Sequence, residues 1–351
     1  MKSHSSSPAK RIAKFDNIRA FLIIMVVLGH GLTPFLSSHL IKATTLWLYT
    51  YHMPLFVFLG GLFSKKAING DSFYIPRIVS YLILGFLMKI AVHGTLLLCG
   101  RNPAFSWLDE KGVAWYIFAM AAHLVITRLV RKLPHTALLC GGTAFAVAAG
   151  YLNFIDDTLV LSKTIVFFPF FYLGYIVDTD KLLHIICRKN VRIASSVFLI
   201  LFTAGIFLLT DGIYSLRYLF SGNNPYYEFG DDWYFIGGLL RLGGYVLSSL
   251  VSFCFMSVMP KREIPFFTII GTNSLSTYVF HRPVQYALES LFFISLAAAL
   301  EPITVLLLTL GVSYIISIIL AQKPFFFVLK PFSNTKGFLE SIKKLKNKSN
   351  K

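Results

Sequence analysis

Residues 16–30 read DNIRAFLIIMVVLGH, a short polar start followed by an apolar run that continues to about residue 38. An apolar helix of about 20 residues is long enough to cross a hydrocarbon core roughly 30 Å thick. The run is longer than the apolar part of a signal peptide and has no small-x-small cleavage site. We therefore expect it to stay in the protein as the first membrane span.

Similar apolar runs recur along all 351 residues, of which 56% are hydrophobic and 14% are charged. The mean hydropathy is +0.67. Because soluble proteins contain about 25% charged residues, this composition excludes a water-soluble globule. The sequence predicts an all-α, polytopic integral membrane bundle of about ten transmembrane helices, near residues 18–38, 43–63, 77–98, 113–130, 136–153, 159–177, 193–210, 234–258, 273–295 and 302–321.

The distribution of Lys and Arg predicts the orientation of this bundle. With the N-terminus inside, 25 of the 33 Lys and Arg fall on the cytoplasmic side, and only five fall outside: Lys42, Arg101, Lys111, Lys163 and Arg217. The positive-inside rule then places both termini in the cytoplasm. The expected parts are a cytoplasmic segment 1–17, a transmembrane domain 18–321 and a basic cytoplasmic tail 322–351, disordered or resting on anionic membrane lipids.

Two further compositional features narrow the function. The net charge of +17 follows from the topology, and because no basic face stands apart from the spans, we expect no nucleic-acid partner. The four cysteines lie far apart, without a CxxC pair or a His at zinc-ligand spacing. We expect neither a disulfide framework nor a metal.

Arg19 and His30 are unusual polar residues in the first span, since polar side chains are costly in lipid. Eleven helical steps of about 100° end about 20° past three full turns, so both side chains share one helix face, about 16 Å apart along the axis. Two interpretations stay open: the pair acts together in function, or a snorkelling Arg accompanies a structural histidine. Asp16 or Asn17 is expected to cap this helix.

Other polar and aromatic residues have two interpretations each. His281 and Arg282 lie inside the ninth span, where they take part in catalysis or acceptor binding, or form buried structural contacts. Trp115 and Tyr116 line an acceptor site or belong to the aromatic belt. His52, two residues before Pro54, faces an outer cavity or marks a helix kink.

The longest outer connection, 211–233, combines carboxylates with Tyr and Trp. Asp231 and Trp233 are its candidates for hydrogen bonding and stacking on a sugar acceptor. The alternative is a solvated loop with interfacial aromatic residues.

The stretch DNIRAFLIIMVVLGH resembles the first span of the membrane acyltransferase-3 family, which is marked by an Arg, ten residues and a His. Four further segments resemble family patterns in the same order: YHMPLFVFLGGLF at 51–63, AWYIFAMAAHLV at 114–125, FFPFFYLGYIVD at 167–178 and GTNSLSTYVFH at 271–281. YHMPLF and PFFYLGY are most similar to the fucose 4-O-acetylase-like, or WecH-like, O-acetyltransferase branch.

The resemblance implies an enzyme of the bacterial inner membrane that transfers an acyl group, usually acetyl, from cytoplasmic acyl-CoA to a hydroxyl of an envelope glycan or lipid-linked sugar. Acetyl-CoA is then a cosubstrate, and no tightly bound cofactor is expected. The family's Arg and His map to Arg19, which would bind acyl-CoA, and His30, which would act as the base. Direct transfer and an acyl-histidine intermediate both stay open.

One departure from the family pattern concerns the start of the third span, where many members carry R-x-x-R. Here Tyr74 replaces the first Arg and only Arg77 remains, so Lys65 or Lys66 is expected to supply the missing charge for acyl-CoA binding. The other interpretation of these three cations is ordinary positive-inside charge. For the whole chain, a transporter or flippase for a lipid-linked sugar stays the alternative, because intramembrane charges also mark transport paths.

Overall fold

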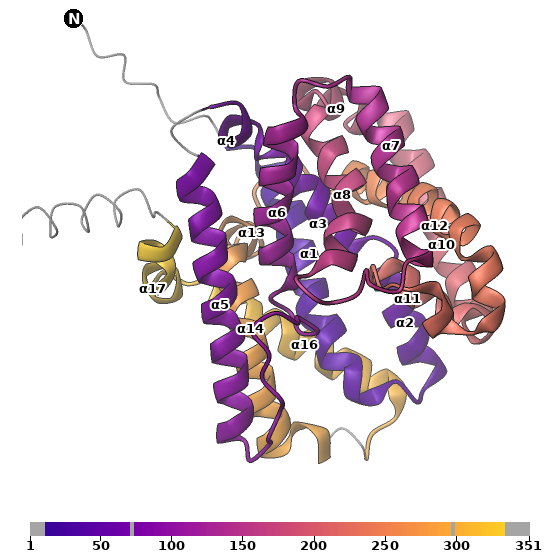
Figure 1. The fold of residues 1–351 in the computed structure, drawn as a ribbon. Coiled ribbons are helices and arrows are strands. Elements are labelled where there is room, and N and C mark those ends of the chain that lie inside the picture. Colours follow the sequence, from indigo (N-terminus) through magenta and orange to yellow (C-terminus); the bar gives the residue numbers. More distant parts are fainter. Residues whose placement is uncertain (1–10, 71–73, 296–298, 334–351) are drawn as a thin grey trace, which may run out of the picture.

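The chain forms a helical bundle, seen here in a computed structural model that describes residues 11–70, 74–295 and 299–333 (Figure 1). Within those ranges the β pairing is a single isolated bridge between Asp109 and Thr158. The predicted all-α class is confirmed. The predicted cytoplasmic ends, 1–10 and 334–351, lie outside the described residues.

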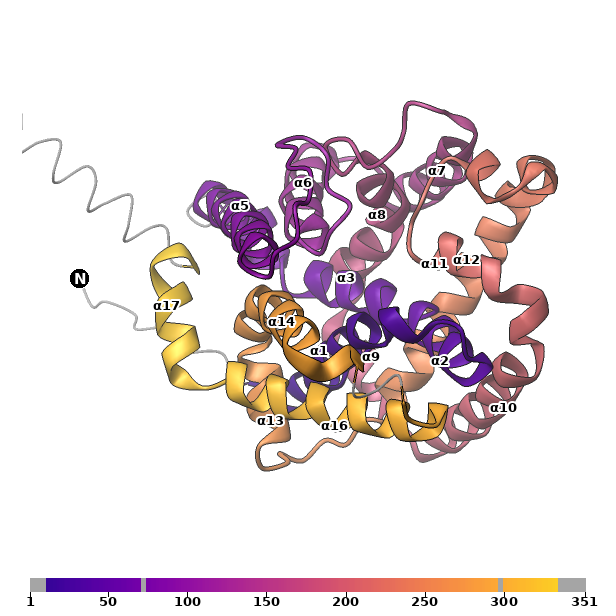
Figure 2. The same ribbon diagram turned by 90° about the horizontal axis from the view of Figure 1, so that it is seen from below.

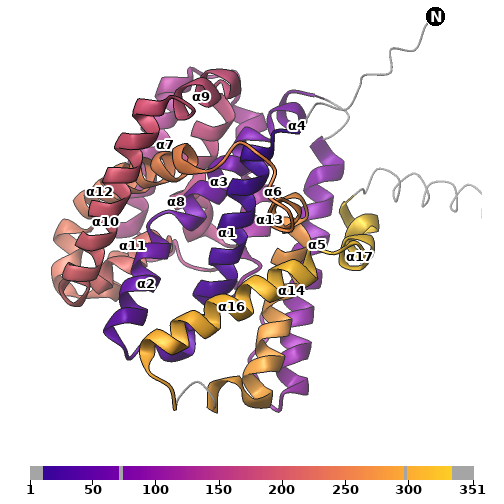
Figure 3. The same ribbon diagram turned by 180° about the vertical axis from the view of Figure 1, so that it is seen from behind.

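Helix α1 (Ala13–Leu32) occupies the centre of the bundle. Its side chains are buried along nearly the whole helix, and Figure 2 shows α5 (Tyr74–Leu98) and α10 (Lys189–Ile213) on opposite sides of it. Helices α13 (Phe267–Thr272), α14 (Ser274–Leu288) and α16 (Pro302–Leu320) pack against α1, and α16 crosses it obliquely in Figure 3. The span with the Arg and His is therefore the one that most other elements surround.

The second predicted span is broken into α2 (His39–Tyr49) and α3 (His52–Leu62). Helix α3 crosses α8 (Leu161–Ile176) at backbone contact, because a Cβ atom on Gly61 would lie 1.9 Å from the Phe171 carbonyl oxygen. A Cβ atom on Gly174 would lie 2.0 Å from the Phe58 carbonyl oxygen. Two glycines thus permit this crossing, as small residues do in membrane helix pairs.

The remaining helices complete the wall of the bundle. They are α4 (Lys65–Asn69), α6 (Trp115–Val130), α7 (His135–Ala148), α9 (Thr179–Ile186), α11 (Arg217–Phe220), α12 (Asp231–Val258) and α17 (Lys323–Ser333), with 3₁₀ turns at Thr33–Phe35, Ala149–Tyr151, Tyr214–Leu216 and Tyr226–Phe229 and a π-helix at Glu289–Phe293. Helix α17 packs on α5 and α14, so the beginning of the predicted tail is an ordered helix.

Five helical stretches of the described chain are long and apolar enough to cross a membrane: Ala13–Phe35, Tyr74–Leu98, Lys189–Phe220, Trp233–Val258 and Pro302–Leu320. A sixth arises if α8 and α9, which meet at 95°, count as one broken span. Each of the ten predicted segments contains helix, but several helices are too short to cross alone. The protein is a membrane protein by composition and helix length, and the number of crossings stays a prediction.

The connection 99–114 folds back into the bundle instead of staying at the surface. Lys89, near the middle of α5, donates to the Asp109 carbonyl at 2.5 Å and pairs with the buried Glu110 carboxylate at 3.3 Å. Glu110 N–H donates to the Asp157 carbonyl at 3.3 Å, which joins this connection to the one before α8. These contacts explain why α6 begins only at Trp115.

The prediction that Asp16 or Asn17 caps α1 is wrong. The helix begins at Ala13, ahead of both candidate capping residues, and no side chain caps its N-terminus. Asn17 instead donates to the carbonyls of Pro260 and Arg262, and it accepts a hydrogen bond from Thr268 at 2.7 Å. These long-range bonds tie α1 to the loop after α12, and tertiary contacts therefore decide the role of Asn17.

Candidate functional site

A polar cavity of about 360 Å³ lies at the C-terminal end of α1. Its wall comes from α1, α2, α3, α6, α8, α14 and the connections between them. The lining residues are Val26, Gly29, His30, Tyr49, His52, Met53, Lys111, Gly112, Trp115, Asp157, Lys163, Ser221, Asn223 and Tyr278. Since it holds an imidazole, hydroxyls and charged groups, the cavity suits a small polar substrate.

His30 faces this cavity from the last turn of α1 and lies beside His281 of α14. Their ring centroids are 5.5 Å apart and the ring planes are inclined by 36°. His281 is fully buried, and its Nδ1 lies 2.7 Å from the Tyr278 carbonyl oxygen. Its Nε2 has no hydrogen-bond partner among the described residues. The structure thus brings two predicted site residues together.

Arg282, the neighbour of His281, forms contacts of its own. Its Nη1 pairs with the Glu289 carboxylate at 2.9 Å, and its guanidinium lies 3.8 Å from the ring centroid of Tyr286. Both charged groups are largely buried. A buried, paired and stacked cation has a structural explanation, and Arg282 does not line the cavity.

The two aromatic candidates of α6, Trp115 and Tyr116, have different surroundings. Trp115 lines the cavity and stacks on Phe167 at 5.1 Å between ring centroids. Tyr116, one residue further, contacts Phe56 and Tyr278 instead. His52 also lines the cavity, while its Nδ1 lies 2.6 Å from the Leu48 carbonyl oxygen at the break between α2 and α3.

Sequence reasoning missed three charged cavity residues. The sequence places Lys111 and Lys163 among the outer charges and does not single out Asp157, yet all three line the cavity, and Lys163 forms an ion pair with Asp157. They reach it because the two connections before α6 and α8 turn inward together. The sequence does show many charges around these connections, but charge density alone does not predict whether a connection lies at the surface or inside the bundle.

At the other end of the shared face, Arg19 lies near the start of α1. Its Nη2 donates to the Asp16 carboxylate at 2.8 Å, and its guanidinium lies 4.8 Å from the ring centroid of Phe63. Its Nε is buried without a hydrogen-bond partner among the described residues. Arg19 therefore keeps an unused donor beside a fixed charge.

Arg77 of α5 comes close to the same place from another helix. Its Nε and Nη2 both donate to the Tyr81 hydroxyl at 3.2 Å. Arg19 and Arg77 both lie within electrostatic range of the Tyr116 hydroxyl. Arg19 of α1 and Arg77 of α5 are thus two guanidinium groups in the neighbourhood of one tyrosine, and guanidinium groups are suited to binding phosphate.

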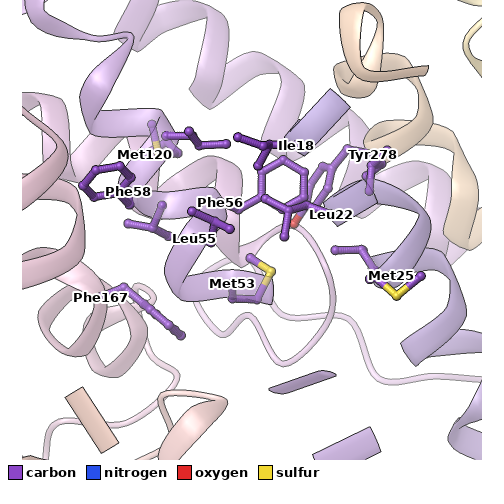
Figure 4. Packing of buried hydrophobic residues seen from close by; sticks show 14 of the residues in the cluster. Ile18, Leu22, Met25, Met53, Leu55, Phe56, Phe58, Met120, Phe167 and Tyr278 are labelled. Carbon is purple, nitrogen blue, oxygen red and sulfur yellow. The ribbon is translucent and has the colours of Figure 1, made fainter. Parts of the chain in front are cut away.

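Buried side chains of Leu22, Met25, Phe56 and Tyr278, here called the apolar barrier, belong to the hydrophobic core around α1. Leu22 and Met25 lie between Arg19 and His30 on α1, and Figure 4 shows them packed with Phe56 and Tyr278. The Tyr278 ring contacts Tyr116 on one side, at 5.3 Å, and His281 on the other, at 5.8 Å.

Lys65 and Lys66 begin α4, a short helix that contacts α5 and α6. Lys65 donates to the Val177 carbonyl, and Lys66 follows it in the same short helix. The guanidinium that lies over the Tyr74 ring, 5.1 Å from its centroid, belongs to Arg128 of α6. The structure therefore places Arg128, which sequence reasoning did not single out, at this position.

The outer-loop candidates lie at the start of α12. Trp233 is partly exposed and packs edge to face on Phe229, with 6.0 Å between ring centroids, and it does not line the cavity. Asp231 begins α12, but its side chain lies outside the described residues. The 211–233 connection instead contributes Ser221 and Asn223 to the cavity.

Comparison with known proteins adds a family and one relative. Residues 12–322 match a family described as an acyltransferase domain. The chain is 27% identical over 198 residues to the nodulation protein NolL of Mesorhizobium japonicum, covering 50% of this chain and 51% of the relative. The chain thus spans about half the length of that relative. No solved structure matches.

Proposed function

The chain belongs to the acyltransferase-3 family, and from this premise we propose that it transfers an acetyl group from cytoplasmic acetyl-CoA to a hydroxyl of a cell-envelope glycan or lipid-linked sugar. The observation that carries the proposal is the arrangement along α1. The Arg19 guanidinium lies near the N-terminal end of this helix, and the His30 imidazole lies in a polar cavity at its C-terminal end. The family assignment favours an enzyme over the transporter considered above.

The chemistry needs a base, because a sugar hydroxyl attacks a thioester slowly. In direct transfer, His30 takes the hydroxyl proton while the oxygen attacks the thioester carbonyl carbon. The carbon–sulfur bond then breaks, and the CoA thiolate takes the proton from the imidazolium. In the route through an acyl-histidine, the unprotonated His30 nitrogen attacks the carbonyl carbon, and the carbon–sulfur bond breaks to release the CoA thiolate. The sugar hydroxyl then attacks the acyl carbon, the carbon–nitrogen bond breaks, the freed imidazole takes the hydroxyl proton, and the proton passes to the thiolate. Both routes require an unprotonated His30 nitrogen facing the cavity.

The donor would be held by its phosphates. Arg19, with its unused Nε donor, and Arg77 are positioned to bind them, since guanidinium groups bind phosphate through paired, charge-assisted hydrogen bonds. The pantetheine arm would then extend toward His30 over about 16 Å of helix rise. The acceptor would occupy the polar cavity, where Trp115 offers an aromatic face and Asp157 and Lys163 offer charge.

Sided membrane vesicles test this proposal. Inside-out vesicles supplied with radiolabelled acetyl-CoA should transfer label to glycan, whereas sealed right-side-out vesicles should fail until they are permeabilised. Glycans from cells with and without the gene should differ by one acetyl-sized mass increment. Donor consumption by sealed right-side-out vesicles, or accumulation of an unmodified lipid-linked sugar on the inner leaflet, would contradict the proposal.

A further inference from the structure

Beside His30, the buried ring of His281 has one nitrogen in use and one without a partner. Nδ1 lies 2.7 Å from the Tyr278 carbonyl oxygen and 3.2 Å from that of Thr277. A carbonyl oxygen only accepts hydrogen bonds, so Nδ1 carries the proton. Nε2 is then an acceptor, and it is buried without a partner among the described residues.

The position of the ring limits which group can use this acceptor. Two carbonyls of its own helix hold the Nδ1 edge, so the Nε2 edge points away from the α14 backbone. The rings in contact with His281 are His30 at 5.5 Å and Tyr278 at 5.8 Å between centroids. The Tyr278 hydroxyl already donates to the Val113 carbonyl. His30 is therefore the polar ring beside it whose N–H is available.

We infer that His281 is a positioning residue for His30: a small rotation of the two rings, whose centroids lie 5.5 Å apart, lets the unpartnered Nε2 of His281 accept the N–H of the His30 imidazole. This bond fixes the His30 tautomer that presents an unprotonated nitrogen to the cavity. In hydrolases a carboxylate performs this task for the base. Among the described residues no carboxylate is hydrogen-bonded to His30, and the nearby Glu289 pairs with Arg282. A neutral imidazole, held by backbone carbonyls, replaces the carboxylate here.

The packing of α14 on α1 near the two histidines supports the inference. Gln285, one turn after His281, donates from Nε2 to the Val27 carbonyl at 2.7 Å. A Cβ atom on Gly31 would lie 2.8 Å from Thr309 and 3.3 Å from the Gln285 amide nitrogen. Such close packing keeps the two histidine rings at a fixed separation, which orientation of a base requires.

Two matched substitutions distinguish positioning from a structural role, on the premise that the proposed function holds. In His281→Asn the side-chain amide can still donate to the Tyr278 carbonyl, but no acceptor remains at the Nε2 position. In His281→Gln the amide oxygen reaches that position. We expect His281→Asn to lower kcat by about tenfold or more, since an orienting partner of a catalytic histidine is worth up to about 10⁴-fold. His281→Gln should retain most of the rate, and neither variant should change the acetyl-CoA KM.

A double-mutant cycle completes the test. In the His30→Ala background, His281→Asn should cause no further loss, because a positioning residue acts only through the base. Full activity of His281→Asn, equal losses in the Asn and Gln variants, or additive losses in the cycle would overturn the inference. Failure of the proposed function is distinguishable, because the wild-type protein itself would then transfer no acetyl group from acetyl-CoA to glycan.

Discussion

Arg19→Lys tests the donor site most directly, because it keeps the charge and removes the planar set of donors. In the structure, one Arg19 nitrogen is bonded to Asp16 at 2.8 Å and Nε is buried without a partner. A lysine Nζ can keep the Asp16 contact, but it then has no rigid second donor for phosphate. The variant should therefore fold normally, but it should bind acetyl-CoA more weakly than wild type.

The size of the effect follows from the bonds that are lost. A charge-assisted hydrogen bond contributes about 1.5–3 kcal/mol, and each 1.4 kcal/mol is about tenfold in affinity, so the acetyl-CoA KM should rise by about 10- to 150-fold. The rate at saturating acetyl-CoA should largely recover, since the lost contact binds ground state and transition state alike. Initial rates at increasing acetyl-CoA in permeabilised vesicles give both quantities.

Arg217→Lys is the matched control. Arg217 stacks on Tyr214 and Tyr218 in the 211–233 connection, far along the chain from the donor site, so the same substitution there should leave the acetyl-CoA KM unchanged. An unchanged KM in a correctly folded Arg19→Lys protein would refute the donor-binding role. Arg19 would then serve only to pair with Asp16 at the start of α1.

Three further outcomes are expected. His30→Ala should lower transferase activity by about 10²–10⁴-fold while the protein stays inserted, and activity above about a tenth of wild type would refute the base role. Asp157→Asn should raise the acceptor KM without changing the acetyl-CoA KM, because Asp157 lines the cavity. If Trp233→Ala raises the acceptor KM and Asp157→Asn does not, the glycan binds at the outer loop and not in the cavity. Gly174→Ala should abolish the folded, monodisperse protein in size-exclusion chromatography, because its Cβ would lie 2.0 Å from the Phe58 carbonyl oxygen; normal elution would show that α3 and α8 can separate.

The fold class and the long helices followed from the sequence because apolar runs of membrane length admit few alternatives. The helix-wheel argument on α1 also placed Arg19 and His30 at two ends of one helix. A helical wheel does not predict which residues of other helices contact Arg19 and His30. The contact between His30 and His281 joins positions 251 residues apart in the chain, and only the packing of α14 on α1 creates it.

The residues whose surroundings the sequence did not predict have one physical cause in common. Local composition does not determine how deeply a residue is buried in the bundle or which distant segment contacts it. Lys89 lies inside the predicted span 77–98, and the inward-folding connection 99–114 supplies its partner, Glu110. The same connection carries Lys111 into the cavity wall. The expected cap Asn17 was assigned from local preference, but buried carbonyls of a distant loop compete for its amide.

The apolar barrier gives the proposed function a physical constraint. A charged donor and a polar acceptor must react at one carbon atom, yet an open polar path between the two sides would also conduct ions. Leu22, Met25, Phe56 and Tyr278 pack in the buried core around α1, and in the proposed function they would close that path. The pantetheine arm is the one part of acetyl-CoA that is slender and weakly polar, so it can displace these side chains while the phosphates stay at Arg19 and Arg77. In the proposed function, a separation of about 16 Å between Arg19 and His30 along the helix would thus let the donor reach His30 without moving charge through the barrier.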